Sequence, residues 1–335
     1  MKLLRIIGLP IAFVYGLIVH LRNFLYDVGF LRSKSFQTPT VCVGNLSLGG
    51  TGKTPMVELL VTELKDNLKI AVLSRGYKRK SKGFVLAKND STVDSLGDEP
   101  YQIYKKFSRI TLAVDSDRGN GIITLEKEIK PNLIILDDAF QHRKVKPTFS
   151  ILLTAFNNYY KNDYFLPFGT LRDSRNQANR AQIIVVTKCP QNLSIKEQES
   201  ILKSLNPIDH QKVLFSYIAY NSVLKGTTNE KTLEAIQDKQ VTLVTGIANP
   251  LPLIDYLNSK SINFEHLRFK DHHAFNENEI TILNSKDFVL TTEKDFVRLK
   301  GKVEKLAYVE MKHQFINEGK TELINELKMA TKLNF

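Results

Sequence analysis

A glycine-rich segment that ends in a lysine and a threonine is the part of this sequence best suited to chemistry. Gly49, Gly50 and Gly52 allow backbone N–H groups to curl around an anion without clashes from Cβ atoms. Lys53 can then reach the β- and γ-phosphates of a nucleotide, and Thr54 can offer its hydroxyl to Mg²⁺. These residues predict a phosphate-binding loop of the P-loop type.

The flanking sequence supports this loop. Apolar residues at 40–43 predict a strand that enters it, and a helical pattern begins at Pro55, so that the positive end of the helix faces the anion. Ser47 departs from the strict pattern, which has glycine at that position. A plain strand-to-helix connection is the alternative, but it leaves a lysine at a helix N-terminus unexplained. The predicted nucleotide-binding residues are Ser47, Gly49, Gly50, Thr51, Gly52, Lys53 and Thr54.

Two carboxylates follow another apolar run. Asp137 and Asp138 end the predicted strand at 133–136, which puts them at the carboxyl edge of a sheet, where the triphosphate lies. They can hold Mg²⁺ directly or through water, and the alternative is an aspartate that caps a helix or turn. Gln141 and His142 would lie at the same rim.

Two further clusters are ambiguous from their residue types alone. Asp98 and Glu99 stand in an acidic turn that would serve equally well as a helix N-cap. Asp271, His272 and His273 could bind a metal, form a proton relay or be solvated, and their adjacent positions point the side chains in different directions.

Composition limits the choice of partners. The 335 residues carry a net charge of +12, which favours nucleic acid, a membrane surface or a phosphorylated substrate. Residues 74–82 form the main basic cluster, yet the chain has none of the usual nucleic-acid-binding motifs, so we expect no nucleic acid partner. Cys42 and Cys189 are too few to predict a disulfide framework or a zinc site.

The N-terminal region is apolar. Residues 6–19 carry no charge, with Lys2 and Arg5 before them and Arg22 after them. This run is shorter than the roughly 20 residues that a spanning helix needs. We expect residues 1–30 to form a helix in a membrane interface, with a helix packed on the protein's own core or a single span as the alternatives.

The order of elements predicts the fold class. Continuous apolar strands alternate with helical patterns, which is typical of an α/β fold whose mostly parallel sheet is covered on both faces. Residues 159–180 lack periodicity and predict a long functional loop. We expect a P-loop NTPase-like core at 31–220, a connecting segment at 221–240 with a short strand at 231–233, and a smaller C-terminal α/β lobe at 241–335.

Taken together, these segments resemble one family, the tetraacyldisaccharide 4'-kinases, over nearly the whole chain. The resemblance rests on a set of motifs in a shared order: Gly49-Gly50-Thr51-Gly52-Lys53-Thr54-Pro55, Ser74-Arg75-Gly76-Tyr77, Gly97-Asp98-Glu99-Pro100, Asp137-Asp138-Ala139-Phe140-Gln141-His142, Leu171-Arg172, Gly246-Ile247-Ala248-Asn249-Pro250, Asp271-His272-His273 and Thr291-Thr292-Glu293-Lys294-Asp295. Departures from the family pattern are Ala139 for glycine, Lys78 for glycine, Asp173 for glutamate and Lys270 for proline.

The resemblance implies an enzyme that uses ATP and Mg²⁺ to phosphorylate the 4'-hydroxyl of a tetraacylated glucosamine disaccharide 1-phosphate, giving lipid IVA in lipid A biosynthesis. Its partners would be this lipid A precursor and the inner-membrane surface, where the enzyme would be peripheral or monotopic on the cytoplasmic face. Asp98 would accept the proton of the hydroxyl, supported by either His272 or His273. Lys53 would neutralise the triphosphate, and Arg172 would stabilise charge in the transition state. The other implied roles are binding of Mg²⁺ by Thr54, Glu99, Asp137 and Asp138, and binding of substrate by Arg75, Gln141 and His142.

A membrane-associated ATPase switch is the alternative from another class, because such proteins share the Gly-Gly-x-Gly-Lys-Thr sequence. Their extra lysine is absent here, where Leu48 stands, and their membrane helix is commonly C-terminal. A nucleic-acid-stimulated ATPase has only the net charge in its favour.

Overall fold

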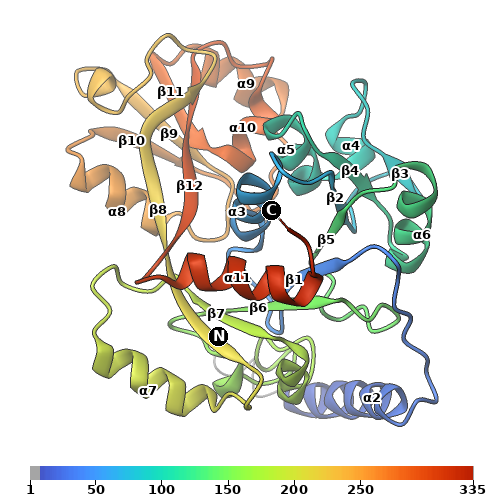
Figure 1. The fold of residues 1–335 in the computed structure, drawn as a ribbon. Coiled ribbons are helices and arrows are strands. Elements are labelled where there is room, and N and C mark those ends of the chain that lie inside the picture. Colours follow the sequence, from blue (N-terminus) through green and yellow to red (C-terminus); the bar gives the residue numbers. More distant parts are fainter. Residues whose placement is uncertain (1–7, 335) are drawn as a thin grey trace.

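The structure, a computed structural model, describes residues 8–334 and consists of a long twisted sheet with helices on both sides (Figure 1). The strands are β1 (Thr40–Asn45), β2 (Ile70–Ser74), β3 (Val85–Leu86), β4 (Thr111–Val114), β5 (Leu133–Asp137), β6 (Phe149–Ala155), β7 (Ile183–Thr187), β8 (Lys212–Gly226), β9 (Val241–Thr245), β10 (Phe264–Arg268), β11 (Phe288–Thr292) and β12 (Leu306–Phe315). The α-helices are α2 (Leu9–Asp27), α3 (Lys53–Leu64), α4 (Val93–Leu96), α5 (Asp98–Lys106), α6 (Arg118–Glu128), α7 (Ile195–Leu205), α8 (Leu251–Ser259), α9 (Glu277–Asn284), α10 (Glu293–Leu299) and α11 (Gly319–Thr331).

The described strands form one sheet in the order β10-β9-β11-β12-β8-β7-β6-β1-β5-β2-β4-β3. Neighbouring strands are parallel except for the pairs β8–β12 and β3–β4. Strand β1, which leads into the phosphate-binding loop, lies between β5 and β6. The predicted α/β class with a mostly parallel sheet is confirmed.

Each strand of the central sheet buries side chains on both faces. Val41 and Val43 of β1 pack in the cluster beneath α3, α5 and α11, whereas Cys42 packs in the cluster on the opposite face. This second cluster contains Phe140, an almost fully buried residue of the loop that follows β5. A strand buried on both faces has apolar residues at successive positions and does not alternate between polar and apolar ones. This is why the continuous apolar runs in the sequence correspond to the central strands.

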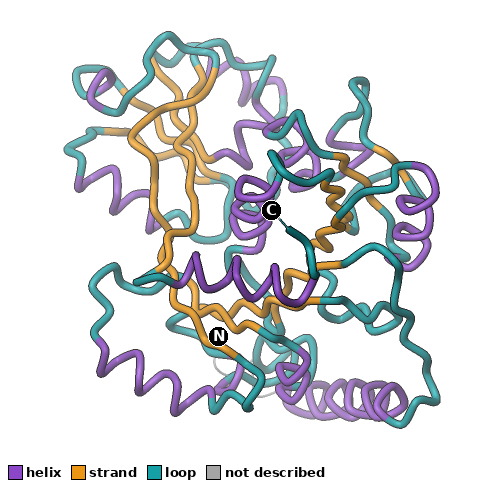
Figure 2. Tube along the Cα trace, viewed as in Figure 1, coloured by secondary structure: helices purple, strands orange, loops and turns teal. Residues whose placement is uncertain are grey.

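Strands β8 and β12 join the two ends of the sheet. β8 pairs in parallel with β7 at its start and then runs antiparallel to β12 (Figure 2). Because β8 continues to Gly226, it passes through the predicted boundary at residue 220, and the division into two lobes stays a prediction. The strand predicted at 231–233 is reduced to an antiparallel bridge between Thr232 and Val223, flanked by backbone hydrogen bonds to β8, before the chain turns into a 3₁₀ helix at Glu234–Ile236.

Helix α2 packs against the protein with a stripe of small and polar residues. Ala12, Gly16, Val19 and Asn23 are buried, at spacings that put them on one helical face. The large apolar side chains of the helix are exposed: Leu9, Ile11, Phe13, Val14, Leu17, Ile18, Leu21 and Phe24. The helix is long and apolar enough to cross a membrane, although core helices and signal sequences can share these properties.

Gly44 is a sensitive packing position in β1, because an added Cβ would lie 2.5 Å from Cβ of Phe140. We predict that Gly44→Ala lowers the free energy of unfolding by about 1–3 kcal/mol through overpacking. Chemical denaturation monitored by circular dichroism measures this change. Gly50→Ala is the matched control, since an added Cβ there meets only Nζ of Lys188, at 3.9 Å, and its stability should equal that of the native chain. Equal stability of the Gly44 variant would contradict the prediction.

Candidate active site

The phosphate-binding loop joins β1 to α3 and takes the predicted form. Gly52 is in the left-handed region, with φ of 87°, and the helix begins at Lys53. A Cβ on this glycine would lie 2.7 Å from Nε2 of His313, so both the backbone angle and the packing require glycine. His313 of β12 donates from Nε2 to the Gly52 carbonyl at 2.9 Å, and its Nδ1 lies 3.1 Å from the Ser216 hydroxyl.

Four polar side chains converge beside this loop. Lys53 Nζ lies 3.3 Å from Oδ1 of Asn45 and 3.8 Å from Oδ1 of Asp138. Arg172 forms a two-pronged ion pair with Asp138 and also donates to Asn45. Burial would raise the pKa of Asp138, but Lys53 and Arg172 outweigh it and hold this pKa below its usual range. Two cations are therefore held where a triphosphate would enter.

Asp137 has a different environment from its neighbour. Its Oδ2 accepts a hydrogen bond of 2.8 Å from Ser74, but its buried Oδ1 has no partner among the described residues. Burial, with Glu99 and Asp138 nearby, raises the pKa of Asp137 to about 6. An unpaired buried carboxylate oxygen beside a phosphate-binding loop fits a hard cation. Thr54, the remaining predicted metal ligand, lies in the first turn of α3.

A second cluster forms at the start of α5. Oδ2 of Asp98 lies 2.7 Å from Nδ1 of His272 and also accepts from Arg298, whose Nε donates to Oδ1 at 3.3 Å. Nε2 of His272 lies 3.1 Å from Nζ of Lys294. Nδ1 of His272 also lies 3.1 Å from Nη2 of Arg298, so the imidazole, the guanidinium and the carboxylate form one connected group.

Asp98 is ionised in this setting. Burial alone would raise the pKa of its carboxyl, yet the hydrogen bonds from Arg298 and His272 hold the pKa below its usual range. Glu99, the next residue, is partly exposed and lies 3.7 Å from Nζ of Lys294. The base candidate and the metal candidates are close neighbours, since Glu99 also raises the pKa of Asp137.

The two adjacent histidines are in separate environments. Nε2 of His273 lies 2.9 Å from Glu279, and its ring stacks on Phe269 and meets Phe275 edge to face. Glu279 also closes the capping box of α9, so His273 belongs to the packing of that helix. His272 has the left-handed backbone angle φ of 62°, which turns its side chain toward Asp98 instead. Of the two, only His272 contacts the predicted base.

The predicted substrate residues lie around the rim. The Gln141 amide donates to the Asn45 carbonyl at 2.6 Å, which ties the loop that follows β5 to the end of β1. Nε2 of His142 is buried and has no hydrogen-bond partner among the described residues, while Arg75 is exposed. Burial and the nearby Arg118 lower the pKa of His142, so this imidazole is neutral at physiological pH.

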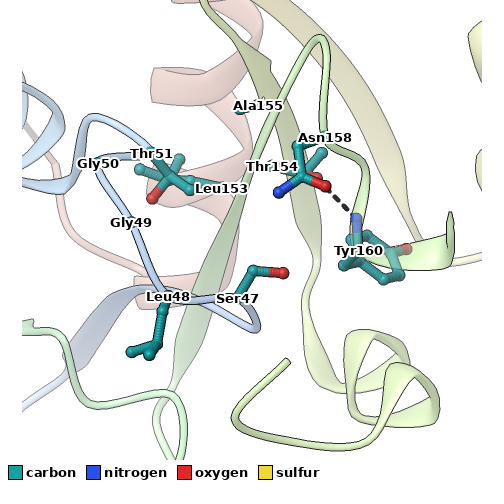
Figure 3. A pocket seen from close by; sticks show the side chains of 10 residues that line it. All are labelled: Ser47, Leu48, Gly49, Gly50, Thr51, Leu153, Thr154, Ala155, Asn158 and Tyr160. Carbon is teal, nitrogen blue, oxygen red and sulfur yellow. Dashed lines mark hydrogen bonds between the residues drawn. The ribbon is translucent and has the colours of Figure 1, made fainter. Parts of the chain in front are cut away.

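A small cavity opens beside the phosphate-binding loop (Figure 3). It has a volume of about 110 Å³ and lies between Gly49 and Gly50 and the end of β6, with Asn158 and Tyr160 at its far side. The Ser47 hydroxyl, also in the wall, donates to Asp163 at 3.0 Å. Ser47 is therefore engaged by the 159–180 segment, and any contact it makes with phosphate would come from its backbone.

Sequence reasoning missed several side chains of the site. Asn45, the last residue of β1, connects Lys53 and Arg172, although it stands only four residues before the glycine-rich turn. Lys294 and Arg298 reach the Asp98 cluster from α10, whose buried Asp295 receives an ion pair of 3.0 Å from Arg298. The Thr-Thr-Glu-Lys-Asp motif was visible, but nothing local to it predicts a partner 200 residues away.

Comparison with known proteins identifies the family. A sequence profile of the family described as tetraacyldisaccharide-1-P 4'-kinase matches residues 4–329. The chain belongs to this family. The tetraacyldisaccharide 4'-kinase of Flavobacterium johnsoniae is 48% identical over 323 residues, covering 95% of this chain and 94% of that protein. The enzyme of Flavobacterium psychrophilum is 44% identical over 342 residues and 99% of each chain.

A solved structure agrees with the family. The crystal structure of LpxK from Aquifex aeolicus in complex with ATP matches with a TM-score of 0.80 and 29% identity, covering 97% of this chain and 99% of that one. As a tetraacyldisaccharide 4'-kinase, the chain is an ATP-dependent kinase of lipid A biosynthesis that phosphorylates the 4'-hydroxyl of its disaccharide. The predicted family, activity and use of ATP are confirmed.

His313 makes the stability of this kinase sensitive to acid. Burial lowers its pKa to about 4 from an ordinary value of 6.5, so between these pH values the unfolded chain binds a proton that the folded chain does not. We predict that stability falls as the pH drops from about 6.5 to about 4, by on the order of 3 kcal/mol from this residue. In thermal unfolding scans across this pH range, the His313→Gln variant should lose less stability than the native chain does. His210→Gln, a change on the surface, should follow the native curve. A curve for His313→Gln parallel to the native one would contradict the prediction.

Proposed function

We propose that Asp98 is the base that accepts the proton of the sugar 4'-hydroxyl and that His272, rather than His273, supports it. The observation that carries this proposal is the 2.7 Å hydrogen bond between Asp98 and His272, made while His273 is held by Glu279. A carboxylate that is ionised at neutral pH is ready to orient and deprotonate an alcohol. In a loose phosphoryl-transfer transition state the proton leaves late, so a strong base is not needed.

Lys53 and Arg172 would supply positive charge to the transferring phosphoryl group. Both already lie beside Asp138, and the entry of a triphosphate would give them a stronger anionic partner. The loop backbone and the N-terminus of α3 add N–H dipoles aimed at the same anion. This arrangement supports direct in-line transfer from ATP to the acceptor.

Asp137 is the residue we propose as the main protein ligand of Mg²⁺, with Asp138, Glu99 and Thr54 as further ligands. Its support is the buried unpaired Oδ1, which a cation would satisfy. No cluster of three acidic, histidine or cysteine side chains within residues 8–334 could hold a metal alone, but kinase Mg²⁺ sites commonly use one or two carboxylates together with substrate phosphates. The ion would neutralise charge on the triphosphate.

Arg75 and His142 are the rim residues that we propose contact the lipid substrate, with Gln141 holding the loop that carries His142. Arg75 is exposed, and Nε2 of His142, which lies 3.8 Å from Asp117, makes no hydrogen bond within the described residues. The neutral imidazole would hydrogen-bond a sugar hydroxyl, and the guanidinium would meet an anionic phosphate.

Helix α2 would lie on the inner-membrane surface at the cytoplasmic face. This proposal is supported by the burial pattern of the helix, which is the reverse of that of an ordinary surface helix: small and polar residues are buried and large apolar residues are exposed. The protein-facing side is anchored by a buried hydrogen bond of 2.7 Å from Asn23 to Asp173, the residue that follows Arg172. Lys2 and Arg5, which would meet anionic head groups, lie outside the described residues.

Transfer of labelled γ-phosphate tests the proposed base. With ATP, Mg²⁺, detergent and a tetraacylated disaccharide 1-phosphate, we predict that Asp98→Asn lowers kcat by a factor of ~10² or more. His272→Gln should also lower kcat, whereas His273→Gln should retain most of the turnover because its ring serves the packing of α9. Lys53→Ala is the inactive reference. Native turnover in the Asp98 variant would remove that residue from the role, and equal losses for both histidine variants would remove the distinction between them.

Vesicle binding tests the membrane role of α2. Replacing Phe13 and Leu17 by Glu should weaken binding to anionic phospholipid vesicles about tenfold or more. The reason is that burial of each apolar side chain in lipid contributes about 1.5–3 kcal/mol to the free energy of binding. Co-sedimentation measures the bound fraction. Ile195→Glu, at an exposed apolar position on α7, is the matched control and should bind as the native chain does. Unchanged binding by the α2 variant would contradict the proposal.

A further inference from the structure

Lys106, the last residue of α5, sits in a buried cluster of charges outside the site described above. Its Nζ lies 2.6 Å from Glu58, 3.0 Å from Glu293 and 2.6 Å from Glu310. Each carboxylate comes from a different element, namely α3, α10 and β12. All four side chains are 14% exposed or less, so water screens the interactions only weakly.

Helices α5 and α10 pack together with an ion pair at each end. At one end Asp98, the first residue of α5, pairs with Arg298 in the last turn of α10. At the other end Lys106, the last residue of α5, pairs with Glu293, the first residue of α10. The helices are therefore antiparallel, and sliding one of them by a turn of about 5.4 Å would break both pairs at once. The two pairs define a single register.

The same lysine reaches the helix that follows the phosphate-binding loop. Glu58 lies in α3, little more than one turn after Lys53, and its other carboxylate oxygen accepts 2.9 Å from Gln102 of α5. Through Glu58, the helix that carries Asp98 is tied to the helix that carries Lys53. A contact between these helices is thus specified by a charge pair and a hydrogen bond as well as by apolar packing.

Burying this cluster of charges costs free energy, so stability alone does not explain it. Two lysines, Lys106 and Lys225, face three carboxylates, so full ionisation would leave a buried excess of negative charge. Burial and Glu293 accordingly raise the pKa of Glu58 to about 7. Buried ion networks are weak evidence for stability, and their best attested use is to specify one register against others.

We propose that Lys106 is a positioning residue, which holds Asp98 at the far end of α5 in register with Arg298 and with the phosphate-binding helix α3. The inference rests on the proposed role of Asp98. Lys106 itself touches no reacting atom, because it lies at the opposite end of the helix from the base. Its effect on the reaction is transmitted by the placement of α5.

Turnover of Lys106 variants tests the proposal in the full-length kinase. Lys106→Met should lower kcat about tenfold or more, because a misplacement near 1 Å is enough for such losses, while the KM for ATP stays within about twofold. Lys106→Arg should recover most of the rate, since it keeps the charge. Lys105→Met is the matched control. Lys105 is exposed and its ammonium group lies over the rings of Tyr101 and Tyr104, so the variant should have the kcat of the native enzyme.

A double-mutant cycle distinguishes an effect on kcat that acts through Asp98 from a loss of kcat caused by an independent disturbance of the fold. If Lys106 acts through Asp98, then adding Lys106→Met to Asp98→Asn should lower kcat by less than about threefold further. Multiplicative losses in the double variant would overturn the inference, and so would a native kcat for Lys106→Met alone. Asp98→Asn is measured in the same series, so a native rate for that single variant would instead reveal failure of the proposed base.

Glu293→Gln keeps the test decisive if Lys106→Met does not fold. This change preserves the shape of the side chain and leaves Lys106 with Glu58 and Glu310, but it weakens the tie to α10. Glu293→Gln should reduce kcat by far less when it is added to the Asp98→Asn variant than when it is introduced into the native enzyme. A thermal unfolding midpoint near the native value, combined with an unchanged kcat, would overturn the proposal.

Discussion

The antiparallel pairing of β8 with β12 is the constraint on which the rest of the structure depends. It joins the strands that carry the phosphate-binding loop to the strands that carry the Asp-His-His motif within one hydrogen-bonded sheet. Because the two strands are long and paired along most of their length, the relative placement of α5 and α10 is set by backbone hydrogen bonds before any side chain of the site is considered. The ion pairs between those helices then refine a position that the sheet has already made nearly correct.

Electrostatics divides the acidic residues of this kinase into two kinds. Asp98 and Asp138 are each held by an arginine and stay ionised, which suits a proton acceptor and a residue that orders cations. Asp137 and Glu58 are buried with too little positive charge, and their carboxyl pKa values rise. Asp137 is the residue proposed to bind Mg²⁺, whereas Glu58 completes an internal cluster, so burial of a carboxylate is associated with different surroundings at the two positions.

The parts of the fold that could be predicted from sequence are those that depend on neighbouring residues. The strand, glycine-rich turn and helix around Lys53, and the acids after β5, follow from local rules and from the geometry of parallel sheets. Arg298 and Lys106 escaped prediction because their partners are remote in sequence and because charged residues on helices usually face solvent. His272 and His273 were indistinguishable, since a single left-handed backbone angle and the capping of α9 decide which of them turns toward Asp98.

The contact between Gly52 and His313 has a consequence for the synthesis of this protein. The loop that grips phosphate emerges early from the ribosome, but the residue that buttresses it is made 261 positions later. Strand β12 must be synthesised, exit the ribosome and pair with β8 before the loop gains this support. A nascent or C-terminally truncated chain would therefore display the whole glycine-rich sequence while lacking a rigid cradle for the nucleotide. The nucleotide-binding loop near the start of the sheet thus depends on a strand that is made much later in the chain.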